Sequence, residues 1–214
     1  MTECELFKLI KTTEYKTAGD AVDYQIIDDK EELITYLIFQ ESNGSKDWKN
    51  NFNFPAKPYK EASQLLFYHG GYCKAWKSAN DVIMNELKEH LEKHYDVYVI
   101  GWSLGGAMAV IAAEEIFYRY HIKSILVTFG APKVCYGKKT VRNVRKSIKF
   151  AVQFANRNDI VTYQPPFSFY GHVGKTSVGE KFSLFKIWNP WKYHTMYDNQ
   201  SLYDVWLKKH AKEL

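Results

Sequence analysis

The feature that most constrains the fold of this chain is the segment Gly101–Gly106, with the sequence GWSLGG. The β-rich run Val97–Ile100 precedes it, and the run Ala107–Phe117, with the small and apolar composition of a buried helix, follows it. A serine between glycines at a strand-to-helix turn is the pattern of a nucleophile elbow, a tight turn that presents the serine hydroxyl above a sheet. Glycines are needed there because a side chain would clash where strand and helix approach closely. The segment therefore predicts a strand, a turn centred on Ser103 and a helix.

The remaining patterns predict an α/β fold. From Lys77 onward helices and strands alternate, and this order requires a mostly parallel sheet with helices on both faces. Two β-rich runs, Val22–Ile27 and Leu33–Phe39, flank Asp28–Lys30 and predict an antiparallel hairpin on the N-terminal side. The other expected elements are a strand at Gln64–Tyr68, a helix capped by Ser78–Asp81 and continuing to Leu91, strands at Tyr95–Ile100, Ser124–Thr128 and Phe150–Phe154, a helix at Leu104–Tyr120, and a final helix at Asn199–Lys212.

Size and composition indicate one domain over residues 1–214. The longest apolar runs are too short to cross a membrane, and the first residues, MTECEL, lack the basic-then-apolar pattern of a signal peptide. The three cysteines, Cys4, Cys73 and Cys135, have neither metal-ligand spacing nor the even number of a disulfide framework. We therefore expect a cytoplasmic protein, unless a leader has been removed.

Positive charge is concentrated in one segment, although the net charge of the chain is only +5. Residues 133–149 hold seven cationic side chains and predict a helix with Val134, Val141, Val144 and Ile148 on its apolar face. The cations either form a solvated helix face or attract the protein transiently to an anionic membrane surface. We do not expect nucleic acid as a partner, because the sequence contains no nucleic-acid-binding module. The cations are Lys133, Lys138, Lys139, Arg142, Arg145, Lys146 and Lys149.

A serine nucleophile needs a base to take its proton and an acid to orient that base. Asp159 is the candidate acid, because it follows the expected strand Phe150–Phe154 at the sheet edge where active sites of open α/β folds lie. Three histidines follow it: His172, His194 and His210. His210 lies in a charged terminal helix and is the weakest candidate. Spacing alone does not separate His172 from His194.

Several segments, in the same order, resemble the lipase class 3 family of fungal triacylglycerol lipases. The resemblance extends from about Thr35 to Tyr197. It implies an α/β-hydrolase fold and a catalytic triad of Ser103, Asp159 and His194, with no metal or cofactor. It also implies that His172, in a His-Val-Gly motif, is not the base. The matching segments are His69–Tyr72 (HGGY), Gly101–Gly106 (GWSLGG), Phe129–Pro132 (FGAP), Asp159–Pro166 (DIVTYQPP), His172–Gly174 (HVG) and His194–Tyr197 (HTMY).

The resemblance also implies an oxyanion hole, formed by the backbone N–H groups of Leu104 and Ser42. Two residues depart from the family pattern. Glu41, after Gln40, stands where the family has Arg-Gly, which places a carboxylate beside the hole; we expect it to point away. Trp102 replaces the histidine of the elbow and adds apolar surface next to the nucleophile.

In the family the stretch after the oxyanion residue forms a lid. Here that stretch is Ser45–Phe54, with Trp48 and Phe52 among its few large apolar side chains. It is either a short interfacial lid or an ordinary surface loop. Trp188, in the aromatic-rich run Phe182–Trp191, either lines an acyl pocket with Trp102 or packs in the core.

Together these features predict a serine carboxylic-ester hydrolase that acts on lipid or acyl esters through an acyl-enzyme. A phospholipase, a thioesterase or an acyltransferase would use the same triad. The alternative from another class is a non-catalytic protein of the same fold that binds lipid or a partner through its basic face. The presence of Ser103, Asp159 and His194 argues against this alternative, whereas Glu41 is its best support.

Overall fold

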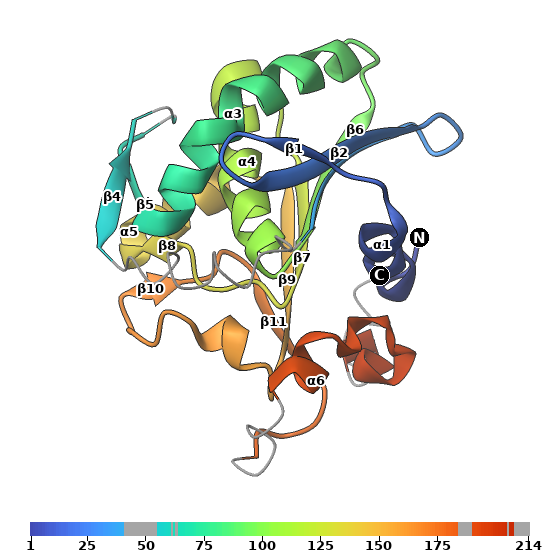
Figure 1. The fold of residues 1–214 in the computed structure, drawn as a ribbon, viewed down its shortest axis with the longest axis vertical. Helices are drawn as coiled ribbons and strands as arrows, with labels where there is room; N and C mark the ends of the chain where they lie inside the picture. The colour runs from blue at the N-terminus through green and yellow to red at the C-terminus, as the bar shows by residue number, and fades with distance from the viewer. Residues whose placement is uncertain (41–54, 61, 63, 184–189, 205, 208–214) are drawn as a thin grey trace.

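A seven-stranded sheet runs through the protein in the order β1-β2-β3-β6-β7-β9-β11 (Figure 1). The structure, a computed structural model, describes residues 1–40, 55–60, 62, 64–183, 190–204, 206 and 207. Strand β2 pairs antiparallel with both β1 and β3, and the strands from β3 to β11 pair in parallel. The strands are β1 (Lys16–Ala18), β2 (Val22–Asp29), β3 (Ile34–Phe39), β6 (Asp96–Trp102), β7 (Ile125–Phe129), β9 (Phe150–Asn156) and β11 (Lys175–Val178).

Helices cover both faces of this sheet, which confirms the predicted α/β-hydrolase architecture. The helices α3 (Gly70–Leu91), α4 (Leu104–Tyr120) and α5 (Gly137–Lys146) pack on one face. The N-terminal helix α1 (Glu3–Thr12) packs on the other face, on the right in Figure 1. The short helices are η1 (Ile160–Tyr163), α6 (Pro190–His194), η3 (Met196–Asp198) and η4 (Gln200–Leu202).

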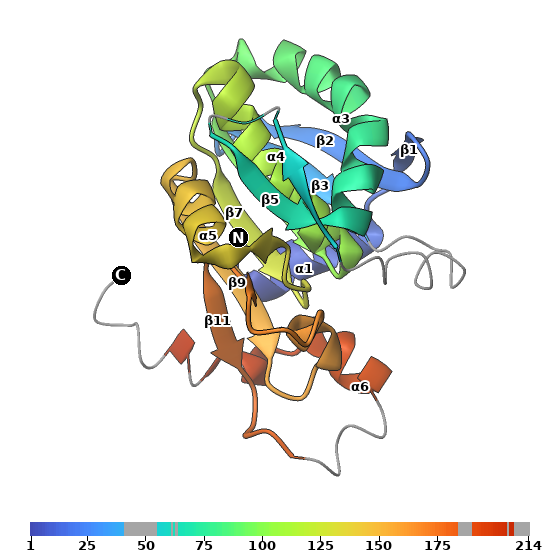
Figure 2. The same cartoon turned by 90° about the vertical axis from the view of Figure 1, so that its left-hand side faces the viewer.

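A second, four-stranded sheet lies beside α3 and α5, in the order β10-β8-β5-β4 (Figure 2). It brings together segments that are far apart in the sequence, because β8 pairs with both β5 and β10. Its strands are β4 (Ala56–Tyr59), β5 (Leu66–His69), β8 (Cys135–Tyr136) and β10 (Tyr170–Gly171).

Three helix predictions differ from the structure. Helix α3 begins at Gly70, directly after β5, so Ser78 lies inside the helix and donates to the Ala75 carbonyl at 2.8 Å instead of capping. The basic helix α5 covers only Gly137–Lys146, because β8 occupies the residues before it, and the expected stripe residues Val134 and Ile148 lie outside it. The expected helix at Asn199–Lys212 begins as the 3-10 helix η4, and residues 208–214 lie outside the described residues.

Helix α1 was absent from the predicted elements, although the sequence carries a signal for it. The Thr2 hydroxyl accepts from the Glu5 amide, and the Glu5 carboxylate accepts from the Thr2 amide, which together form a capping box. Phe7 and Ile10 on the buried face of this helix are fully enclosed.

The turn between β6 and α4 depends on glycines at two positions. A Cβ on Gly101 would lie 2.4 Å from the Gly105 carbonyl oxygen, and a Cβ on Gly105 would lie 2.4 Å from the Gln40 carbonyl oxygen. Both distances are far below van der Waals contact with backbone atoms that cannot rotate away. The strand, the helix and the end of β3 therefore meet closely only because these side chains are absent.

We predict that Gly101→Ala lowers the free energy of unfolding by about 3 kcal/mol or more, because the added methyl group forces the backbone of the elbow apart. The control is Gly137→Ala, where φ is +79° but nothing lies within 4 Å of the added Cβ, so only the left-handed backbone is strained. That variant should lose about 1 kcal/mol. Urea denaturation measures both, and equal losses would contradict the steric explanation.

Candidate active site

Ser103 occupies a strained backbone conformation at the end of β6. Its φ of +56° and ψ of −124° fall outside the regions that non-glycine residues usually adopt. Such a conformation persists where the surrounding structure imposes it, and it is typical of functional sites. The Ser103 amide donates to the Phe129 carbonyl at 2.9 Å, which ties the turn to the neighbouring strand β7. The Ser103 side chain is buried at the N-terminus of α4.

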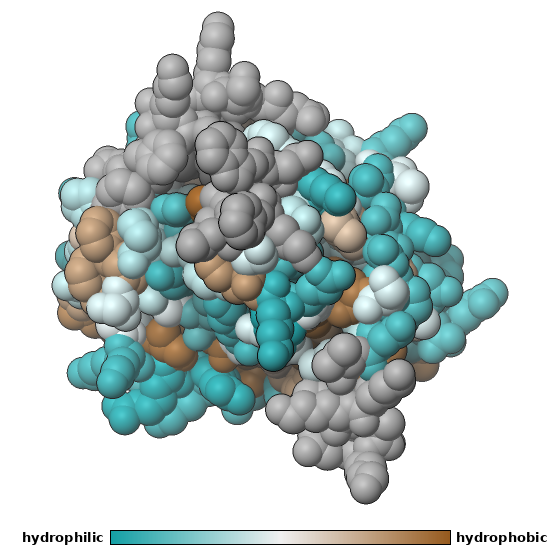
Figure 3. Space-filling model, turned by 90° about the horizontal axis from the view of Figure 1, so that it is seen from below, coloured by the Kyte–Doolittle hydropathy of each residue, from teal (hydrophilic) through white to brown (hydrophobic). Residues whose placement is uncertain are grey.

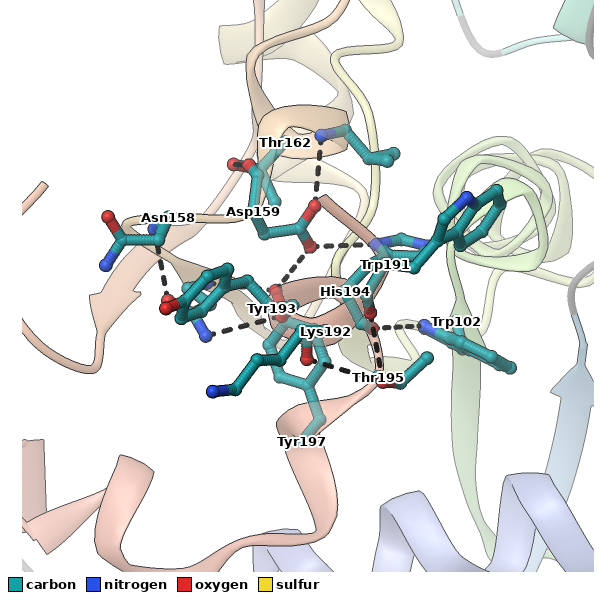
Figure 4. A network of polar contacts seen from close by, with 12 residues as sticks. Trp102, Asn158, Asp159, Thr162, Trp191, Lys192, Tyr193, His194, Thr195 and Tyr197 are labelled. Carbon is teal, nitrogen blue, oxygen red and sulfur yellow. Dashed lines mark hydrogen bonds and ion pairs between the residues drawn. The ribbon is translucent and has the colours of Figure 1, made fainter. Parts of the chain in front are cut away.

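Asp159 accepts three hydrogen bonds and directs one oxygen at a histidine (Figure 4). It follows β9 and caps η1, where its Oδ1 accepts from the Val161 amide at 3.0 Å. Its Oδ2 lies 2.9 Å from His194 Nδ1 and accepts from the Tyr197 hydroxyl at 2.8 Å. The Asp159 and His194 side chains are both buried. When His194 Nδ1 carries the proton and donates it to the Asp159 carboxylate, Nε2 is the acceptor nitrogen of a neutral imidazole.

Trp102 brings the elbow to this pair. Its indole Nε1 donates to the His194 carbonyl at 3.1 Å, and the two rings lie 5.5 Å apart. Ser103 is the next residue along the chain, so this contact ties the turn that carries the serine to the segment that carries His194. Within the described residues, neither Ser103 Oγ nor His194 Nε2 has a hydrogen-bond partner, although both atoms are buried. A hydroxyl and a ring nitrogen that are both enclosed and unpaired are suited to exchange a proton with each other and with a bound substrate.

Gly130 allows the close packing around the pair. Its φ is +58°, and a Cβ there would lie 2.8 Å from Asp159 Oδ2 and 3.0 Å from His194 Nδ1. Any side chain would therefore push the carboxylate and the imidazole apart. The predicted FGAP segment thus has a direct structural reason to contain glycine at this position.

The sequence reasoning placed Tyr197 in the HTMY segment without giving it a role, and it missed α1 altogether. The Tyr197 hydroxyl accepts from the Asn156 amide at 2.9 Å and donates to Asp159 Oδ2, the same carboxylate oxygen that faces His194, so it helps to hold that oxygen in place. Burial raises the pKa of this hydroxyl well above its usual value, so it stays protonated and able to donate. Phe7 of α1 packs against Tyr197, Phe129 and Trp102 with ring centroids 5.2 to 5.7 Å apart.

His172 is held away from this role by its own contacts. Its Nε2 lies 2.9 Å from the Thr162 carbonyl oxygen, and burial lowers its pKa to about 4. His69 is buried, stacks on Tyr72 at 4.2 Å, and also has its pKa lowered to about 4 by burial. The hydrogen bond of Asp159 goes to His194, whereas the imidazole of His172 contacts the Thr162 carbonyl oxygen.

Several of the proposed site residues lie outside the described residues: Glu41, Ser42, Trp48, Phe52, Trp188 and His210. The expected lid at 45–54 lies outside them too. Leu104 is described, as the first residue of α4, where its amide belongs to the unpaired N–H groups of a helix N-terminus. The Trp102 ring packs against Phe7 and the ring of His194.

The described residues contain no group of three or more His, Cys, Asp or Glu side chains that could hold a metal ion. No disulfide joins Cys4, Cys73 and Cys135, all of which the structure describes as buried. Among the described helices none is long and apolar enough to cross a membrane.

Comparison with known proteins identifies relatives of this chain. The family model for lipase (class 3) matches residues 36–169. A lipase from Rhizopus niveus is 31% identical over 176 residues, which cover 78% of this chain and 44% of the relative. A protein from Penicillium cyclopium named as a secreted mono- and diacylglycerol lipase A is 30% identical over 106 residues, covering 48% of this chain and 34% of the relative. The chain thus spans less than half the length of these relatives.

The fold is shared with solved structures. The Rhizomucor miehei lipase, solved in complex with its propeptide, superposes with a TM-score of 0.70 at 21% sequence identity, covering 78% of this chain and 56% of that one. This likeness supports the fold assignment independently of the motifs.

We predict that Tyr197→Phe lowers kcat about tenfold with little change in KM, because Asp159 loses a donor that orients it while the substrate loses no contact. The matched control is Tyr203→Phe. The Tyr203 hydroxyl is also buried, and it donates to the Tyr197 carbonyl at 2.7 Å rather than to Asp159. Both variants should lose similar stability in denaturation, and only Tyr197→Phe should be slow. An equal loss of kcat in both would show that the effect is structural.

Proposed function

The chain belongs to the class 3 lipase family, and we propose that it is a serine carboxylic-ester hydrolase that acts on lipid or acyl esters. The observation that carries the proposal is the buried contact between Asp159 and His194, with His194 Nε2 and Ser103 Oγ both buried and unpaired among the described residues and Ser103 on a strained turn. This arrangement supports nucleophilic catalysis by Ser103.

In the proposed reaction, Ser103 Oγ attacks the ester carbonyl carbon while His194 Nε2 takes the hydroxyl proton. The carbonyl π electrons move to the oxygen, which is bound by the amides of Leu104 and Ser42. Asp159 stabilises the imidazolium that forms. The tetrahedral intermediate then collapses, the bond to the alcohol oxygen breaks, and His194 gives its proton to the leaving alcohol. Water, activated in the same way, releases the acid and restores Ser103.

We also propose one domain over residues 1–214 with a short lid at about 45–54, and a cytoplasmic location. The location remains a prediction, because a relative is named as secreted. Trp48, Phe52, Trp102 and Trp188 remain the proposed lid and acyl-pocket residues. The aromatic ring of Trp102, next to the nucleophile, supports its part in this proposal.

Triad variants test the mechanism. Ser103→Ala and His194→Ala should each lower kcat on a p-nitrophenyl ester by roughly 10⁴-fold or more, and the double variant should be little worse, because the triad acts as a unit. His172→Ala is the control: it should retain kcat to the extent that it folds, as judged by circular dichroism. A folded His172→Ala that is inactive, beside an active His194→Ala, would overturn the choice of base.

The same assay can be run with esters of increasing acyl length, with and without detergent micelles. Turnover of at least one ester that disappears in Ser103→Ala supports the hydrolase. The absence of turnover on all of them, with the protein folded, would favour the non-catalytic alternative.

A further inference from the structure

Helix α5 and its flanks form a surface of one charge. Residues 133–149 contain seven cations and no acidic residue. Lys149 pairs with Asp96 at 2.9 Å, whereas Lys138, Arg142 and Arg145 form no ion pair within the part of the chain that the structure describes. Cations that the protein leaves without an internal counter-charge attract anions from outside.

Three of these cations line a groove between α5 and β10. Lys138, Arg142 and Arg145 line it together with Val141, and Phe169 and Tyr170 line it from the β10 side. The groove has a volume of about 550 Å³. Arginine side chains bind phosphate oxygens through two parallel hydrogen bonds, so a phosphate group fits the chemistry of this groove.

Next to the groove lies an aromatic ledge of four residues: Phe67, Tyr136, Phe167 and Phe169. Each exposes between 36% and 48% of its surface. The rings of Phe167 and Phe169 stack at 5.1 Å, and Tyr136 meets Phe169 edge-on at 5.3 Å. The ledge lines a second hollow of about 490 Å³. Phe169 lines both hollows, so the basic groove and the aromatic ledge form one continuous surface.

This surface lies at the catalytic end of the molecule. The segment 130–136 leads from Gly130, beside the triad, to Tyr136, and the segment 159–169 leads from Asp159 to Phe167 and Phe169. Both segments leave the carboxyl ends of parallel strands, as the elbow does. Figure 3 views the molecule from below and shows hydrophobic residues at the surface among hydrophilic ones.

We propose that the α5–β10 groove and the aromatic ledge dock the protein on a bilayer that contains anionic phospholipid. Lys138, Arg142 and Arg145 bind the headgroup phosphates, and the ledge enters the boundary between headgroups and acyl chains. Charge complementarity selects this partner, since cations near an anionic leaflet bind it and aromatic rings prefer the interface. Docking holds the catalytic end against the lipid. The inference rests on the proposed function only in assigning lipid as the substrate.

Vesicle flotation tests the charged part. Wild-type protein should bind vesicles of phosphatidylcholine with phosphatidylserine more tightly than vesicles of phosphatidylcholine alone, and the difference should fade as salt rises from about 0.1 M to about 0.5 M. Arg142→Glu with Arg145→Glu should weaken binding to the anionic vesicles at least about tenfold. The matched control is Lys74→Glu with Lys88→Glu on α3, which changes the net charge equally on exposed positions elsewhere and should retain most of the binding.

A second variant tests the aromatic part. Phe167→Ser with Phe169→Ser keeps every charge but removes two rings from the ledge. It should weaken binding to anionic vesicles at least about threefold and should reduce the binding that remains at high salt, because that part comes from apolar insertion. Unchanged binding in this variant would contradict a docking surface that includes the ledge.

Other outcomes would overturn the proposal. Equal binding to neutral and anionic vesicles, insensitive to the Arg142 and Arg145 changes, would show that the cations are only solvated. Loss of vesicle binding in millimolar inorganic phosphate would indicate a small-anion site, and tighter binding to a duplex oligonucleotide would indicate nucleic acid. Turnover of a soluble short ester should persist in all variants. Failed docking with intact turnover therefore rejects only the surface, whereas absent turnover with intact docking rejects only the hydrolase.

Discussion

The hydrogen bond between His194 Nδ1 and Asp159 Oδ2, 2.9 Å long and buried, is the contact on which the rest of the site depends. It joins a short helix near the C-terminus to the end of β9, two segments that no sheet hydrogen bond holds together. It fixes the orientation of the imidazole ring and therefore the direction in which Nε2 points. The contact exists because Gly130 leaves room for both groups, and because Tyr197 and the Val161 amide satisfy the remaining lone pairs of the carboxylate.

The aromatic packing behind the pair explains why an N-terminal helix belongs to the site. Phe7 of α1 contacts Trp102, which directly precedes Ser103, and Tyr197, which donates a hydrogen bond to Asp159. Trp102 in turn donates to the His194 carbonyl. The nucleophile, the acid and the base thus share one buried support, and it includes residues outside the range 36–169 that the lipase family model matches. Replacing the family's elbow histidine by Trp102 preserves a hydrogen-bond donor at this place while adding packing area.

The sequence predicted correctly those elements that begin at glycines or have strong hydrophobic periodicity. Helix α4 was predicted at Leu104–Tyr120, because Ser103 and the glycines around it indicate where the helix begins. The start of α3 was misplaced because Gly70 and Gly71 disfavour helix locally, and packing of Tyr72, Cys73 and Trp76 overrides that preference. Asp159 could be predicted from its position after a strand. The choice between His172 and His194 could not be made from spacing, since it depends on which loop folds back onto the sheet; only the family resemblance separated them. The role of Tyr197 depends on a contact 38 residues away in the chain, which no local pattern encodes.

The central claim is that Ser103 is the activated nucleophile. The most direct measurement is the labelling of the folded protein with a fluorophosphonate, followed by intact-mass and peptide mass spectrometry. A serine activated by His194 should attack phosphorus and displace fluoride, which gives one adduct per chain, located on Ser103 and absent from Ser103→Ala. An adduct on a different residue, or labelling that persists unchanged in Ser103→Ala, would contradict the account.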